Sequence, residues 1–78
     1  MSNLPKLSGK EIVKILAKDF GFEAIRQSGS HVILKNTLSK QKKVTVVPMH
    51  KEVKIGTLLG ILDLAGIDKE EFLKNLRR

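Results

Sequence analysis

The chain contains no cysteine, tryptophan or tyrosine, and three phenylalanines are its only aromatic residues. Without cysteine it has no disulfide framework, no thiol nucleophile and no zinc–thiolate site. So few aromatic rings argue against the base-stacking platform of sheet-based single-strand binders. No apolar run approaches the ~20 residues of a membrane span, and the N-terminus lacks the apolar segment of a signal peptide. We therefore expect a soluble, cytoplasmic protein with no membrane association.

Positive charge is what the chain has in excess, with 15 Lys and Arg against 8 Asp and Glu and a formal net charge of +7. In a chain of 78 residues, which suffices for a single domain over residues 1–78, this charge favours a polyanionic partner. Ordinary surface lysine that maintains solubility is the alternative explanation. If a nucleic acid is bound, the contacts should be mainly to backbone phosphate and therefore sensitive to salt.

A first helix is predicted after Ser8. Ser8 and Glu11 form a capping-box pattern, in which the hydroxyl accepts an early backbone N–H and the glutamate reaches back to the cap. Apolar residues then gather on one side of the helical wheel: Ile12, Val13, Ile15, Leu16 and Phe20. Gly21 is a natural C-terminal stop for this helix.

Residues 25–34 have the pattern of a tight β-hairpin, because two apolar, β-favouring segments flank Ser28 and Gly29. A two-residue loop at this point gives the pairs Gln27 with Ser30, Arg26 with His31, and Ile25 with Val32. Since cross-strand partners share a face, Arg26 and His31 are expected side by side on one face. Ile25, Val32 and Leu34 are expected together on the opposite face, toward the core.

The remaining elements are a third strand and two more helices. Residues 43–47 are rich in β-branched side chains and predict the strand, which Pro48 ends. A helix from residue 55 or 56 to residue 65, stopped by Gly66, has a predicted buried stripe of Ile55, Leu58, Leu59 and Leu62. A short helix from Asp68 is expected to bury Phe72, Leu73 and Leu76. Leu64 lies off the stripe, so either this last helix covers it or it belongs to a partner surface.

The order helix, three strands, helix, short helix predicts the α+β class. Strands joined by short connections favour a three-stranded antiparallel sheet, with both long helices on one face.

The candidate functional residues lie around the hairpin. Histidine side chains act as base or acid at neutral pH, so His31 is the candidate for proton transfer with the 2′-hydroxyl of RNA. Arg26 offers a bidentate grip on the phosphate, Gly29 allows close backbone approach, and Ser30 offers a hydroxyl and an N–H. The alternative is that His31 is a surface histidine with no role.

Three further residues come from the loop over residues 49–54. His50 is a possible second proton-transfer group if this loop folds toward the hairpin, although a surface or capping role is commoner. Lys51 and Lys54 precede the second helix, whose N-terminal amides attract phosphate. Two histidines without clustered carboxylates argue against a metal site, and we expect no cofactor.

The motifs that carry a family resemblance follow one another at compatible spacings. They are Gly29-Ser30-His31, Val46-Val47-Pro48-Met49-His50, Ile55-Gly56-Thr57-Leu58, and Ile61-Leu62 followed by Ala65-Gly66-Ile67. Over residues 7–76 this series resembles HicA-type mRNA interferase toxins. Two positions depart from the family pattern, because members often carry a basic residue where this chain has Leu59 and a second histidine where it has Val32.

The resemblance implies a double-stranded-RNA-binding-like α-β-β-β-α fold and ribosome-independent cleavage of mRNA centred on His31. It also implies a HicB-type antitoxin that binds the toxin and covers its active site, with growth arrest when the toxin acts. A non-catalytic RNA-binding module of the same fold is the alternative, with contacts from Lys10, Lys14, Lys18, the Ser28-Gly29 tip, Lys51 and Lys54. A protein-interaction subunit that uses Leu64 or the last helix is a third possibility.

Overall fold

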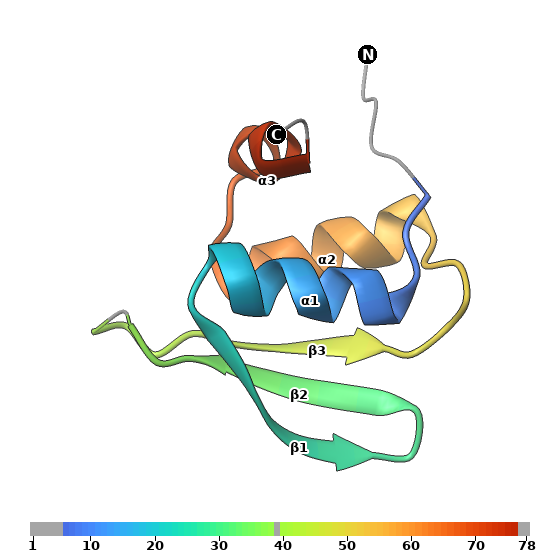
Figure 1. Ribbon diagram of the computed structural model, residues 1–78, viewed down its shortest axis with the longest axis horizontal. Coiled ribbons are helices and arrows are strands. Elements are labelled where there is room, and N and C mark those ends of the chain that lie inside the picture. Colours follow the sequence, from blue (N-terminus) through green and yellow to red (C-terminus); the bar gives the residue numbers. More distant parts are fainter. Residues whose placement is uncertain (1–5, 39, 77–78) are drawn as a thin grey trace.

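A computed structural model describes residues 6–38 and 40–76 of the chain. Its elements are α1 (Gly9–Asp19), β1 (Phe22–Ser28), β2 (His31–Asn36), β3 (Val44–Pro48), α2 (Ile55–Ala65) and α3 (Lys69–Leu76). The strands form one antiparallel sheet in the order β1-β2-β3. α1 and α2 run next to each other over one face of the sheet. α3 lies across the two helices near their C-terminal ends, on the left in Figure 1. The predicted α+β architecture is therefore confirmed.

The start of α1 has the predicted capping box. The Glu11 N–H donates to Ser8 Oγ at 3.1 Å, and the Ser8 N–H donates to Glu11 Oε1 at 2.9 Å. Hydrogen bonding of the carboxyl to the Ser8 backbone N–H, and to the Ser8 side chain, lowers the pKa of Glu11 below its ordinary value of 4.5, with help from the charge of Lys14. Because the folded-state pKa is depressed, the ionised carboxylate stabilises the folded state above about pH 4.5, and this contribution is lost as the pH falls through the folded-state pKa. The helix ends as predicted before Gly21, which has a φ of 73°.

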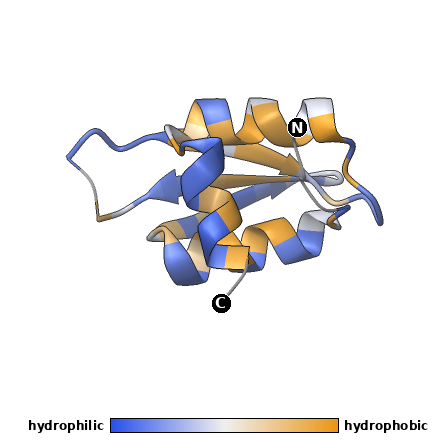
Figure 2. Cartoon of the chain, turned by 90° about the horizontal axis from the view of Figure 1, so that it is seen from above, coloured by the Kyte–Doolittle hydropathy of each residue, from blue (hydrophilic) through white to orange (hydrophobic). Residues whose placement is uncertain are grey.

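The core lies between the inner face of the sheet and the two long helices. β2 and β3 bury Val32, Leu34 and Val47 in one cluster with residues of α1 and α2. Figure 2 shows apolar residues in both helices and in the strands beneath them. Thr45 is the one buried polar residue among those described, and its hydroxyl donates to the Ile61 carbonyl at 2.8 Å. This hydrogen bond ties β3 to α2 inside an otherwise apolar layer.

The buried face of α2 differs from the predicted stripe. Its buried residues are Leu58, Ile61, Leu62 and Ala65, whereas Ile55 and Leu59 are 46% and 40% exposed. Both sets have the spacing i, i+3, i+4, i+7, so the period alone does not choose between them. Contact with the sheet selects the second set, which is rotated around the helix from the first.

α3 is held by one fully buried side chain. The Phe72 ring is stacked with Phe20 at the end of α1, with a centroid separation of 6.3 Å, and Leu73 and Leu76 are partly buried as predicted. The Phe72 N–H donates to the Asp68 carbonyl, so Asp68 immediately precedes the first helical turn. α3 does not cover Leu64, which is 55% exposed. No helix in residues 6–38 and 40–76 has both the length and the apolar character needed to cross a bilayer.

Close contact between α1 and the end of β3 depends on Gly9. The Gly9 N–H donates to the His50 carbonyl at 2.9 Å, and a Cβ at Gly9 would overlap the carbonyl oxygen of Pro48. The N-terminus of α1 therefore lies so close to the backbone at the end of β3 that only glycine fits at position 9.

We expect Gly9→Ala to destabilise the domain by about 1–3 kcal/mol, because the added methyl group pushes α1 away from the β3 backbone. Gly60→Ala is the matched control, since Gly60 lies in α2 and a Cβ there meets open space. It should stabilise the domain by about 0.5–1 kcal/mol through helix propensity. Urea unfolding of the two variants checks the prediction. Equal shifts in both would contradict the close contact at Gly9.

Candidate active site

The hairpin between β1 and β2 turns at Gly29 and Ser30, one residue later than predicted. Ser28 pairs with His31, Gln27 with Val32, and Arg26 with Ile33. Gly29 has a φ of 59°, and glycine at the first central position is typical of a type II′ turn. The requirement for positive φ places Gly29 first in the loop, and the predicted pairs Arg26–His31 and Gln27–Ser30 are therefore wrong.

A β-bulge in β1 gives a second correction. The register shifts between Ala24 and Arg26, which leaves Ile25 without a partner on β2. Ile25 is 52% exposed and does not join Val32 and Leu34 in the core, contrary to the prediction. A bulge inserts one extra residue and turns the following side chains, an effect that alternation in the sequence does not reveal.

Despite the wrong register, Arg26 and His31 lie on the same face of the sheet. His31 and Ile33 alternate along β2 with the buried Val32 and Leu34, so they point away from the helices, onto what we call the outer face. Arg26 pairs with Ile33 and is thus a diagonal neighbour of His31, and residues in such pairs lie about 7–8 Å apart. That separation is within reach of an arginine side chain. Val32 faces the core as predicted, so the missing second histidine does not alter this face.

The segment after β3 starts beside the hairpin. His31 pairs with Pro48 on its other side, and the Met49 N–H donates to the Ser30 carbonyl at 2.6 Å. His50 follows with an exposed side chain, and its backbone carbonyl contacts the start of α1. The structure therefore brings the Gly-Ser-His and Pro-Met-His segments together at one end of the molecule, on the right in Figure 1.

Lys51 and Lys54 are exposed in the connection between β3 and α2, on the same side of the molecule. A hydrogen bond from the Val53 N–H to the Leu7 carbonyl, at 2.7 Å, anchors this connection. Lys54 is the N-cap of α2, and no side chain from the described residues caps the helix. Its first amides thus remain available to an anion.

The candidate residues keep their polar groups available. Arg26, His31, His50, Lys51 and Lys54 are all exposed, and none forms an ion pair with another residue of the described chain. Within residues 6–38 and 40–76, no three His, Cys, Asp or Glu side chains come together in a group able to hold a metal ion. The end of the molecule around His31 is therefore cationic and open to an anionic substrate.

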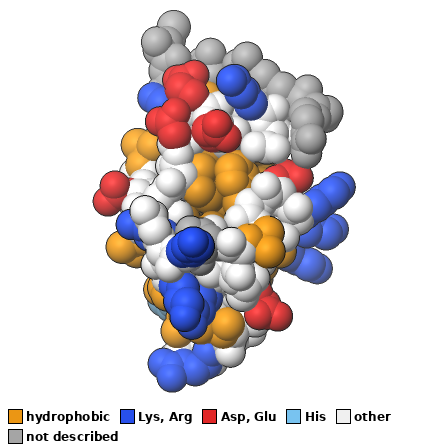
Figure 3. All heavy atoms as spheres, turned by 90° about the vertical axis from the view of Figure 1, so that its left-hand side faces the viewer, with side chains coloured by type: hydrophobic (Ala, Val, Ile, Leu, Met, Phe, Trp, Pro, Cys, Tyr) orange, Lys and Arg blue, Asp and Glu red, His pale blue; other side chains and the backbone are white. Residues whose placement is uncertain are grey.

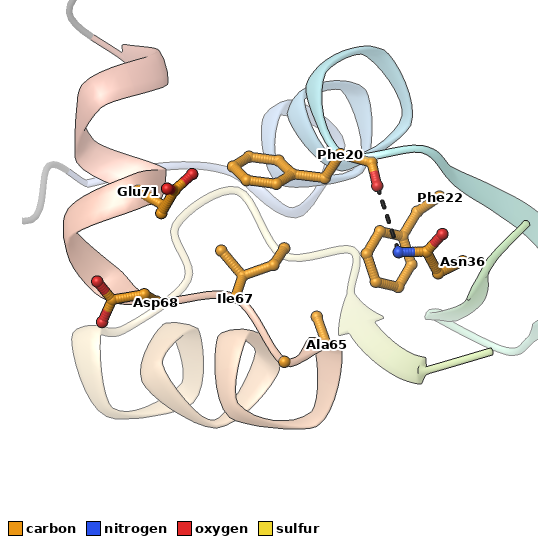
Figure 4. Close-up of a pocket in the computed structure, with 8 residues that line it drawn as sticks. Phe20, Phe22, Asn36, Ala65, Ile67, Asp68 and Glu71 are labelled. Carbon is orange, nitrogen blue, oxygen red and sulfur yellow. Dashed lines mark hydrogen bonds between the residues drawn. The ribbon is translucent and has the colours of Figure 1, made fainter. Parts of the chain in front are cut away.

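A cavity of about 290 Å³ at the opposite end was not foreseen from the sequence. Figure 4 shows Phe20, Phe22 and Ile67 among its lining residues, with the carboxylates of Asp68 and Glu71 nearby. Figure 3 shows carboxylates around this apolar surface, with lysine or arginine side chains both beside them and lower down. The cavity lies at the other end of the molecule from His31 and is therefore separate from the cationic end.

The fold and the cationic end define a small α-β-β-β-α domain with an exposed histidine at the tip of its first hairpin. The model of a family described as the HicA toxin of bacterial toxin–antitoxin systems matches residues 9–67. The chain belongs to this HicA toxin family, and an antitoxin partner follows from that membership. Searches of curated proteins and of solved structures found no significant match. The matched region runs from α1 to the end of α2, and α3 lies beyond it.

Proposed function

We propose that this toxin is a ribosome-independent endoribonuclease that cleaves mRNA in the cytoplasm, with His31 as its catalytic residue. The observation that carries the proposal is the position of His31, which is exposed on the outer face beside the Gly29-Ser30 turn and diagonal to Arg26. An exposed imidazole is able to transfer protons, and a nearby guanidinium is able to stabilise charge on phosphate, and both effects promote phosphodiester cleavage.

In the proposed reaction, RNA supplies the nucleophile. The His31 imidazole takes the proton from a 2′-hydroxyl, and the 2′-oxygen attacks the adjacent phosphorus. The bond from phosphorus to the 5′-oxygen breaks, and that oxygen takes up a proton, for which His50 is the auxiliary candidate. The products are a 2′,3′-cyclic phosphate and a 5′-hydroxyl end. DNA has no 2′-hydroxyl and is not cleaved by this route.

The remaining candidate residues bind the substrate. Arg26 and the backbone of Gly29 and Ser30 stabilise the negative charge on the reacting phosphate. Lys51 and Lys54, at the N-terminus of α2, hold a neighbouring phosphate. A HicB-type antitoxin that covers His31 would block access of mRNA and so relieve the growth arrest.

The proposal is tested with purified protein and a long single-stranded RNA in the presence of EDTA. We expect fragments with 2′,3′-cyclic phosphate ends, because the proposed chemistry uses side chains and the substrate's own hydroxyl. Complete loss of cleavage on chelation would overturn the metal-free mechanism.

Arg26→Ala should lower turnover by roughly 10- to 100-fold, the worth of a charge-assisted hydrogen bond made to the reacting phosphate. Because Arg26 is exposed, its replacement should change the free energy of unfolding by less than about 0.5 kcal/mol. Single-turnover cleavage and thermal unfolding measure the two effects. Lys74→Ala, which removes an exposed cation from α3, is the control. A large fall in Tm for Arg26→Ala would show that the side chain supports the fold instead.

One observation favours the non-catalytic RNA-binding module as a second candidate. Lys10, Lys14 and Lys18 are all exposed along α1, four residues apart, and so form a cationic row on one helix face. Double-stranded-RNA-binding domains use their first helix in this way. The two candidates differ in whether His31 is needed for activity.

A further inference from the structure

A second cavity, of about 340 Å³, opens at the end of the β1–β2 pair away from the hairpin turn. It is lined by Glu23, Ile25, Lys35, Asn36, Thr37 and Lys42. Glu23 and Lys35 are cross-strand partners, and Lys35 follows His31 and Ile33 in alternation along β2. The cavity therefore opens toward the outer face, the face that carries His31.

Two local features of the chain shape this cavity. The bulge in β1 brings Ile25 to the surface, and Lys42 has a φ of 50° in the connection between β2 and β3. The wall residues Asn36 and Thr37 are engaged in structural hydrogen bonds: the Leu38 N–H donates to Asn36 Oδ1 at 2.9 Å, and Thr37 Oγ1 donates to the Gly21 carbonyl at 3.4 Å. These hydrogen bonds fix the positions of Asn36 and Thr37. The other lining side chains are therefore the ones available to contact a ligand.

The remaining side chains offer three kinds of contact. Lys35 and Lys42 are cations, Glu23 is a hydrogen-bond acceptor and Ile25 is an exposed aliphatic surface. Neither lysine forms an ion pair with Glu23 or with any other described residue. A nucleotide matches this combination, since its phosphate pairs with lysine, its base packs on an apolar side chain, and an exocyclic amino group donates to a carboxylate.

The position of the cavity relative to His31 links the two sites. Lys35 lies four positions after His31 on β2, which corresponds to about 13 Å along the strand. Half-buried Ile33 and Val46, paired across β2 and β3, lie on the outer face between them, and Arg26 stands alongside. Lysine and arginine side chains gather at the end of the molecule that carries the β2–β3 connection (Figure 3).

We propose that this cavity is a nucleotide-binding subsite for the RNA strand cleaved at His31. A base with an exocyclic amino group lies on Ile25 and donates to Glu23, and the adjacent phosphates contact Lys35 and Lys42. This inference rests on the proposed ribonuclease function, and it extends the substrate contacts along the outer face to the β2–β3 connection.

The phosphate contacts are tested by the double variant Lys35→Gln/Lys42→Gly, in which glycine suits the positive φ of residue 42. The probe is a fluorescein-labelled single-stranded 12-mer RNA, bound by protein that also carries His31→Ala so that cleavage does not interfere. Two lost phosphate contacts should reduce the slope of log K against log salt by about 1.4. The control, Lys69→Gln/Lys74→Gln on α3, makes a similar charge change and should leave the slope unchanged. Equal slopes in the parent protein, the double variant and the control would overturn the subsite. A protein partner would then be the remaining candidate ligand of the cavity.

The base contacts are tested by Glu23→Thr and Ile25→Thr, both compatible with a strand. In protein that carries His31→Ala, so that cleavage does not interfere, oligocytidylate should bind more tightly than oligouridylate by at least about fivefold, and adding Glu23→Thr should remove this preference. Ile25→Thr should weaken both oligonucleotides without altering the salt slope. An unchanged base preference in Glu23→Thr would overturn the assignment of the base.

Failure of the subsite and failure of the ribonuclease proposal give different results. If the wild-type protein cleaves RNA in EDTA while the lysine double variant binds like the control, the subsite alone is wrong. If no cleavage occurs but the double variant lowers the salt slope, the subsite stands as an RNA contact and the ribonuclease proposal is wrong.

Discussion

Replacing His31 with alanine should lower RNA cleavage by about 10²- to 10⁴-fold, the usual contribution of a general acid–base group. Affinity for RNA should barely change, because the phosphate contacts come from Arg26, Lys51 and Lys54. The fold should also be unaffected, since the His31 side chain is exposed at the start of β2. Cleavage of a long RNA and binding of a short one, measured on the same preparation, separate the two effects.

His50→Ala is the comparison variant for this experiment, because His50 is the auxiliary candidate for protonating the leaving oxygen. Its side chain is also exposed, and it lies at the same end of the molecule, two residues beyond the strand partner of His31. We expect a smaller loss than for His31→Ala, because another donor, including water, is able to protonate the leaving oxygen. Full cleavage by His31→Ala would contradict the catalytic assignment and favour the RNA-binding module.

Phe72→Ala should have the largest effect on stability, about 3–5 kcal/mol. The ring is fully buried and stacks on Phe20, and it is the only buried residue of α3 in the described chain. For a small domain with a total stability of about 5–15 kcal/mol, such a loss is a large fraction. Urea unfolding of the wild type and the variant gives the difference.

The control for this prediction is Leu64→Ala, because Leu64 is exposed and α3 does not cover it. Its replacement should change the free energy of unfolding by less than about 0.5 kcal/mol. A similarly small effect of Phe72→Ala would mean that α3 does not contribute to the core. The result also shows whether the core depends on a helix that lies outside residues 9–67, the region that matches the family model.

Local signals predicted the helices well. The Ser8–Glu11 capping box and the stops at Gly21 and Gly66 depend on hydrogen bonds and φ angles within a few residues, and the structure has all three. Such features are decided by the chain next to them, so the sequence is enough to find them.

Pairing and burial were harder to predict. The hairpin register was wrong by one residue because Gly29 must be first in its turn and because Ile25 forms a bulge. The buried stripe of α2 was right for Leu58 and Leu62 but wrong for Ile55 and Leu59, because two sets of apolar residues satisfy the same helical period. In each case several arrangements agree with the local pattern, and contacts with distant residues select one.

The sequence by itself determined the order of elements, the α+β class, the family and the choice of His31 as the candidate catalytic residue. The sequence also predicted that Arg26 and His31 share a face, but only the tertiary structure decided the register in which they do so and showed that a cavity with Lys35 and Lys42 opens farther along that face. The physical reason is the distance along the chain over which each interaction acts. Caps, stops and periodicity act over a few residues, whereas a shared face depends on strand register, and register is settled by packing of the whole sheet against two helices.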